Sequence, residues 1–74
     1  MNNETQRQWE VDYDHQEKKM IFSFPKRTVQ VIADLKNGGV YAKDNGKYSV
    51  LSQEKEITIA ELEKLLLFVE GGGK

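Results

Sequence analysis

The segment "VYAKDNGKYSVL", residues 40–51, constrains the fold more than any other part of the chain. At its centre is Asn45-Gly46, a dipeptide that tolerates the positive φ angles of a type I′ turn. On either side, apolar and polar residues alternate as they do in strands. The segment therefore predicts a two-residue hairpin in an antiparallel sheet. We expect Val40 and Ala42 to face Val50 and Tyr48 across this hairpin.

Two segments upstream of the hairpin also alternate with a period of two. In "RQWEVDYDH" the apolar and aromatic residues at 9, 11 and 13 alternate with carboxylates, which is typical of a strand with one solvated face. In "MIFSF" the larger side chains, Met20, Phe22 and Phe24, share one face. Pro25 ends this second strand because it has no N–H to donate to a sheet.

Residues 26–36 fit either a strand or a helix. As a strand, Val29, Val31, Ala33 and Leu35 lie on one face and polar residues on the other. As a helix, the segment would end at the "NGG" that follows it, and the fold would be ββαββα. The strand is favoured because β-branched residues crowd positions 28–32, and such residues lower helix propensity.

The C-terminal segment "ITIAELEKLLLFVEGG" carries the signals of a helix. Thr58 and Glu61 have the spacing of a capping box, and Gly71 supplies a stop. At the helical step of about 100° per residue, one apolar stripe forms. Its members are Ile59, Leu62, Leu65, Leu66 and Val69. The expected fold class is therefore α+β: an antiparallel meander of about five strands with one C-terminal helix packed on one face.

A chain of 74 residues folds as one domain with a thin core. We expect residues 1–6 to be a disordered N-terminus, residues 7–70 to form a single small α+β domain, and residues 71–74 to be a flexible Gly-rich tail.

Composition narrows the function classes. The chain has no cysteine, its net charge is −1, and its longest apolar run, residues 65–69, is far shorter than the roughly 20 residues that span a bilayer. These features predict a small soluble protein of the cytoplasm, with no membrane contact. Cysteine-free chains of this size are common among bacterial and phage accessory proteins.

No residue pattern predicts catalysis, a cofactor or a metal. Glu10, Asp12 and Asp14 follow one another on one strand face beside His15, the only histidine. Neighbours on such a face are nearly 7 Å apart, so these carboxylates fan out instead of converging on an ion. No nucleophile lies beside a base in a known motif, and no glycine-rich phosphate loop is present. We therefore expect a non-enzymatic protein that acts by binding.

The C-terminal helix predicts where a partner binds. Leu67 points about 140° away from Leu62, and Phe68 about 120° in the other direction, by the 100° helical step. A single sheet covers only one side of this helix, so we expect Leu67 and Phe68, bounded by Glu63 and Lys64, to form a protein-interaction surface. The chain would be a small regulator, inhibitor or adaptor that binds another protein or, as a homodimer, itself.

The alternative is weak binding of single-stranded nucleic acid by sheet aromatics and lysines. It is not favoured, because nucleic-acid-binding domains usually carry a basic excess. The residues that would make these contacts are Lys18, Lys19, Lys26, Arg27, Tyr41, Lys43, Lys47 and Tyr48.

Overall fold

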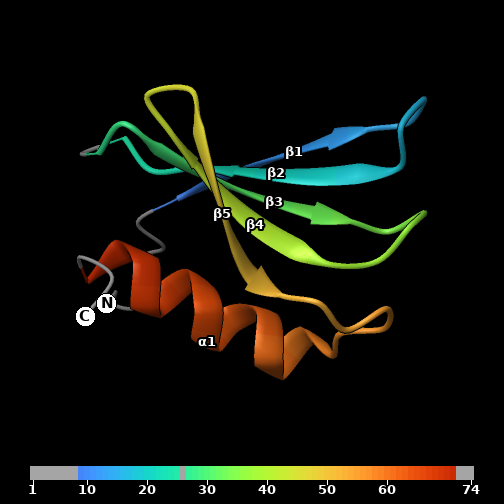
Figure 1. Ribbon diagram of the computed structural model, residues 1–74. Coiled ribbons are helices and arrows are strands. Elements are labelled where there is room, and N and C mark those ends of the chain that lie inside the picture. The colour runs from blue at the N-terminus through green and yellow to red at the C-terminus, as the bar shows by residue number, and fades with distance from the viewer. Residues whose placement is uncertain (1–8, 26, 72–74) are drawn as a thin grey trace, which may run out of the picture.

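The computed structural model describes residues 9–25 and 27–71, which form one antiparallel sheet and one helix (Figure 1). Each strand pairs with its sequence neighbours in the order β1-β2-β3-β4-β5. The expected α+β meander with a C-terminal helix is confirmed. Residues 1–6 and 72–74, predicted to be disordered or flexible, lie outside the described residues. The elements are β1 (Glu10–Asp14), β2 (Lys19–Ser23), β3 (Val29–Asp34), β4 (Val40–Asp44), β5 (Lys47–Ser52) and α1 (Ile59–Glu70).

The ambiguous segment forms the central strand, β3. It pairs with β2 on one side and β4 on the other, so the ββαββα alternative is wrong. Val31 and Ala33, 0% and 1% exposed, point toward the helix, while Gln30 and Ile32 alternate onto the opposite face. Leu35 was expected on the buried face but is 50% exposed, because the strand ends at Asp34 and the chain turns there.

The β4–β5 hairpin turns at the predicted position. Asn45 and Gly46 have φ angles of 54° and 83°, and both are positive, as a type I′ turn requires. The turn is open to solvent, since a Cβ added at Gly46 would meet no atom within 4 Å.

The pairing expected across this hairpin is wrong by one residue. Tyr41 lies opposite Val50, and Ala42 opposite Ser49. A slip of one residue moves each side chain to the other face of a sheet. Val50 and Tyr48 therefore lie on the face away from α1. The register shifts once, between Val40 and Tyr41, and Leu51 packs against the core.

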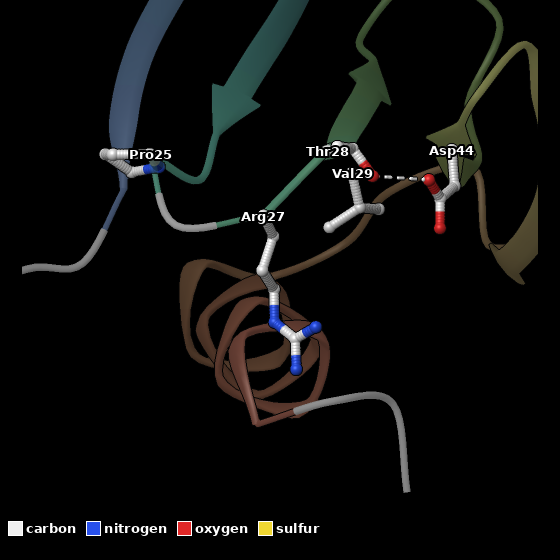
Figure 2. A pocket seen from close by; sticks show the side chains of 5 residues that line it. All are labelled: Pro25, Arg27, Thr28, Val29 and Asp44. Atoms are coloured by element: carbon white, nitrogen blue, oxygen red, sulfur yellow. Dashed lines mark hydrogen bonds between the residues drawn. The ribbon is translucent and has the colours of Figure 1, made fainter.

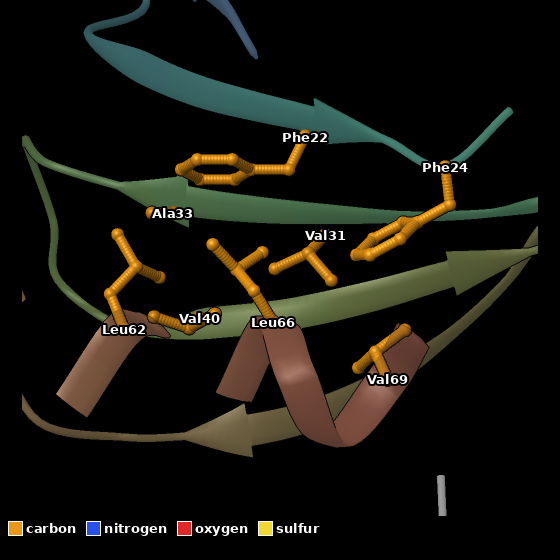
Figure 3. Close-up of a cluster of buried hydrophobic side chains, with 8 residues drawn as sticks. All are labelled: Phe22, Phe24, Val31, Ala33, Val40, Leu62, Leu66 and Val69. Carbon is orange, nitrogen blue, oxygen red and sulfur yellow. The ribbon is translucent and has the colours of Figure 1, made fainter. Parts of the chain in front are cut away.

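The core lies between the sheet and one side of α1 (Figure 3). It confirms the predicted burial of the two phenylalanines of "MIFSF" and of three residues of the helical stripe. The buried apolar residues are Phe22, Phe24, Val31, Ala33, Val40, Leu62, Leu66 and Val69.

α1 begins with the predicted capping box. The Glu61 N–H donates to Thr58 Oγ1, and the Thr58 N–H donates to Glu61 Oε1, each at 3.1 Å. The predicted stripe is wrong at Ile59, which is 77% exposed because it faces the open side of the helix toward β1. Leu65 is only partly buried. Among the described residues, no helix has both the length and the apolar character needed to cross a membrane.

Candidate binding surfaces

One face of the sheet is not covered by α1; we call it the open face. Its central row crosses all five strands, because consecutive cross-strand partners lie on the same face. The row is acidic at β1 and apolar or aromatic from β2 to β5, where Val50 is 64% exposed. Its members are Asp12, Ile21, Ile32, Tyr41 and Val50.

Four of the residues predicted to contact nucleic acid lie together on the open face. The rings of Tyr41 and Tyr48 are 5.8 Å apart, and Lys43 Nζ is 5.7 Å from the centroid of the Tyr48 ring. The Tyr41 phenol oxygen beside Lys19 raises the pKa of that ammonium. Tyr48 is 60% exposed, so this cluster presents one accessible aromatic ring with a cation beside it.

The other predicted basic residues lie elsewhere. Lys18 is in the β1–β2 turn, and Lys47 follows the β4–β5 turn at the opposite end of the sheet. Lys47 pairs with Asp44, which pairs with Val29, so it lies on the helix side of the sheet. Lys26 falls outside the described residues. Those predicted basic residues that the structure describes therefore do not form one continuous surface.

Arg27 has a structural contact at the C-terminal end of α1. Its Nε donates to the carbonyl oxygen of Glu70 at 3.1 Å, and a cation there complements the helix dipole. Arg27 also lines a polar hollow of about 470 Å³ with Pro25, Thr28, Val29 and Asp44 (Figure 2). Inside this hollow, the Thr28 hydroxyl donates a hydrogen bond to Asp44 Oδ1 at 2.9 Å, so its proton is already used within the protein.

Carboxylates share the open face with the lysines. Glu10, Asp12 and Asp14 of β1 lie there, and so does Asp34 of β3, the cross-strand partner of Lys19. Acidic side chains at one side of the face oppose the binding of a polyanion across it. Within residues 9–25 and 27–71, no group of three or more His, Cys, Asp or Glu side chains is placed to hold a metal ion.

Asp34 is a buried carboxylate with a structural role. Its Oδ1 accepts hydrogen bonds from the backbone N–H groups of Lys36 and Asn37 at 3.0 and 2.9 Å. The hydrogen bond from the Asn37 backbone is the main cause that lowers the pKa of Asp34 below its ordinary value. These bonds order the β3–β4 turn.

The outer side of α1 exposes the residues that the sequence singled out. Leu67 is 57% and Phe68 44% exposed, and Glu63 and Lys64 are exposed as well. Leu67 and Phe68 lie about 100° apart around the helix, so their side chains point in different directions. Leu67 continues the row of Ile59 and Glu63 at four-residue spacing, on the side of α1 that faces β1.

An apolar groove of about 320 Å³ lies between β1 and α1; we call it the β1 groove. It exists because the helix does not cover the inner face of β1, where Val11 and Tyr13 are 46% and 40% exposed. Figure 1 shows β1 and β2 at the end of the sheet that is farther from α1. Sequence reasoning placed Val11 and Ile59 on buried faces and so missed the groove. Its lining residues are Trp9, Val11, Met20, Phe22, Ile59, Leu62, Glu63 and Leu66.

Comparisons of the chain with protein-family models, curated proteins and solved structures found no match. The β1 groove, the open face and the outer side of α1 are therefore the features from which a function can be inferred.

Proposed function

We propose that this protein is a non-enzymatic protein-binding module that contacts its partner through the β1 groove and the adjoining side of α1. The observation that carries the proposal is the gathering of exposed apolar side chains there. Val11 and Ile59 line the groove at 46% and 77% exposure, and Leu67, at 57%, extends the same side of the helix. Exposed apolar side chains gathered in this way mark interaction sites on small proteins.

The composition of the groove also favours a protein partner. Trp9 lines one wall and packs against Phe24 with ring centroids 5.9 Å apart, so its ring is held in place by the core. Rigid aromatic side chains are common energetic anchors of protein interfaces. Glu63 lies at the edge of the groove and gives it a polar rim, which is the usual anatomy of an interface. The proposed location is the cytoplasm, where a cysteine-free chain is unaffected by reducing conditions.

The test compares polar substitutions on two surfaces. Ile59→Gln and Leu67→Gln change the groove side, and Val50→Gln is the matched control on the open face, where Val50 is similarly exposed. Tagged full-length protein is used to enrich binding proteins from cells that produce it, and sedimentation velocity measures self-association. We expect the two groove variants to lose partners that wild type and Val50→Gln retain. Identical partners and identical sedimentation for all four proteins would contradict the proposal.

A second candidate function is binding of single-stranded nucleic acid on the open face. The pairing of Tyr41 and Tyr48 with Lys43 supports it, since bases stack on aromatic rings beside cations. The carboxylates of β1 on the same face weigh against it. Fluorescence anisotropy with oligothymidylate, for wild type and Tyr48→Ala, separates the two functions. Binding tighter than about 1 µM that persists at about 0.15 M salt and is lost in Tyr48→Ala would favour this second function.

A further inference from the structure

The outer edge of β1 is a strand edge that a partner can extend. β1 is the first strand of the sheet and pairs only with β2 among the described residues. The Tyr13 N–H donates to Asp12 Oδ1 at 3.1 Å, so this N–H does not point toward β2. Hydrogen-bonding groups alternate between the two sides of an antiparallel strand. The backbone groups of Val11 therefore point outward as well, and together with the Tyr13 carbonyl they can hydrogen-bond an added strand. The Tyr13 N–H can join them once it leaves Asp12 Oδ1.

The two faces of β1 differ in chemistry. Val11 and Tyr13 lie on the groove side of β1. Val11 lines the groove together with the exposed Ile59 of α1. The opposite side carries only carboxylates, from Glu10, Asp12 and Asp14. A strand added at this edge would continue both faces at once, because side chains of neighbouring strands stand beside one another on the same face.

We propose that the β1 edge binds an extended segment of a partner protein in which basic and apolar residues alternate. The basic side chains would lie beside Glu10, Asp12 and Asp14, and the apolar ones would enter the β1 groove against Ile59. Backbone hydrogen bonds to β1 would supply affinity, and the alternating side chains would supply specificity. This inference rests on the proposed function and names the chemistry of its partner.

Charge argues against a second copy of the chain at this edge. Two β1 strands paired antiparallel and centred on Asp12 would place Asp12 opposite its own copy and Glu10 opposite Asp14. Other registers that keep the apolar faces aligned also set carboxylate beside carboxylate. Like charges directly opposite one another destabilise a strand pair. A basic partner strand replaces this repulsion with attraction.

The experiment uses two capped synthetic peptides with the full-length protein, one of Arg-Val repeats and one of Glu-Val repeats. Backbone amide NMR shifts locate binding, and titration calorimetry measures affinity. The Arg-Val peptide is expected to shift Val11 and Tyr13 most and to bind at least about fivefold more tightly than the Glu-Val peptide.

Two variants and one control test the mechanism. Val11→Pro removes an outward N–H without touching the pairing with β2, and proline is tolerated where the N–H faces solvent. Asp12→Lys reverses a charge on the acidic face. Glu56→Lys makes the same charge change in the exposed segment before α1. We expect Val11→Pro and Asp12→Lys each to lower the affinity for the Arg-Val peptide about fivefold or more. Glu56→Lys should leave this affinity unchanged.

Several results would overturn the inference: equal binding of the two peptides, strongest shifts on the open face, or an affinity that Asp12→Lys leaves unchanged. Thermal melting checks that Val11→Pro is folded. If it is not, the peptide affinity of Asp12→Lys alone decides whether the inference holds. If the Arg-Val peptide does not bind, but Ile59→Gln still abolishes binding of partners that wild type captures, this inference fails and the proposed function stands.

Discussion

Three consecutive leucines of α1 provide an internal test of how the helix is oriented. Leu66 is 2% exposed, Leu65 is partly buried at the rim of the core, and Leu67 is 57% exposed. Replacing each with alanine makes the same chemical change in the same helix, so the difference in helix propensity is shared. The three variants therefore differ only in what the side chain contacts.

The expected losses follow from burial. Leu66→Ala removes three buried carbon atoms at about 0.8 kcal/mol each, and the cavity left behind raises the loss of unfolding free energy to about 3–4 kcal/mol. Less than half of the Leu67 side chain is shielded from water, so Leu67→Ala is expected to cost about 0.5 kcal/mol. Leu65→Ala falls between, at about 1–2 kcal/mol.

Urea unfolding followed by far-ultraviolet circular dichroism measures these differences. A small domain loses about 1 kcal/mol of stability per molar urea, so the Leu66→Ala midpoint should fall by about 3 M, or the variant should be unfolded in water. Leu67→Ala should overlay on wild type within error. Equal losses for Leu66→Ala and Leu67→Ala would refute the orientation of α1, and the surface assigned to the β1 groove with it.

The remaining predictions concern turns and caps. Gly38→Ala should destabilise the fold more than Gly46→Ala. Both glycines have positive φ angles, but a Cβ at Gly38 would lie 2.6 Å from the backbone of Lys55. Thermal melting of the two variants measures the difference. The pKa of Asp34 is lower in the folded chain than its value of 3.8 in the unfolded chain, so the ionised carboxylate stabilises the fold when the pH is above 3.8. This stabilisation is lost as the pH falls through the lower pKa of the folded chain. Urea midpoints from neutral pH to about pH 2 should therefore fall less for Asp34→Ala than for wild type. Thr58→Ala should cost about 1 kcal/mol in urea unfolding, because the cap of α1 is lost.

The local elements could be predicted because each depends on short-range rules. Alternation located the strands, the Asn45-Gly46 turn located the hairpin, and the Thr58 capping box located the start of α1. The open face was also within reach of the sequence. A two-residue turn pairs Asp44 with Lys47, and counting back from that pair places Tyr41 opposite Val50, on the face away from the helix.

The β1 groove could not be predicted in this way. Periodicity shows which sides of β1 and α1 are apolar, and on that basis Val11 and Ile59 were assigned to the core. Whether those sides meet depends on the twist of the sheet and the angle of the helix across it, which are set by packing of the whole domain. In the folded chain they lie across an open groove. Leu67 was correctly predicted to be exposed, because that prediction required only the helical step.

Site-specific photo-crosslinking tests the central claim most directly. A photoreactive amino acid is placed at Ile59, in the β1 groove, or at Val50, on the open face, in cells that produce the protein. Both positions are strongly exposed, at 77% and 64%. Binding through the groove predicts a discrete protein adduct from position 59 and none from position 50. Protein or nucleic-acid adducts from position 50 alone would contradict the account.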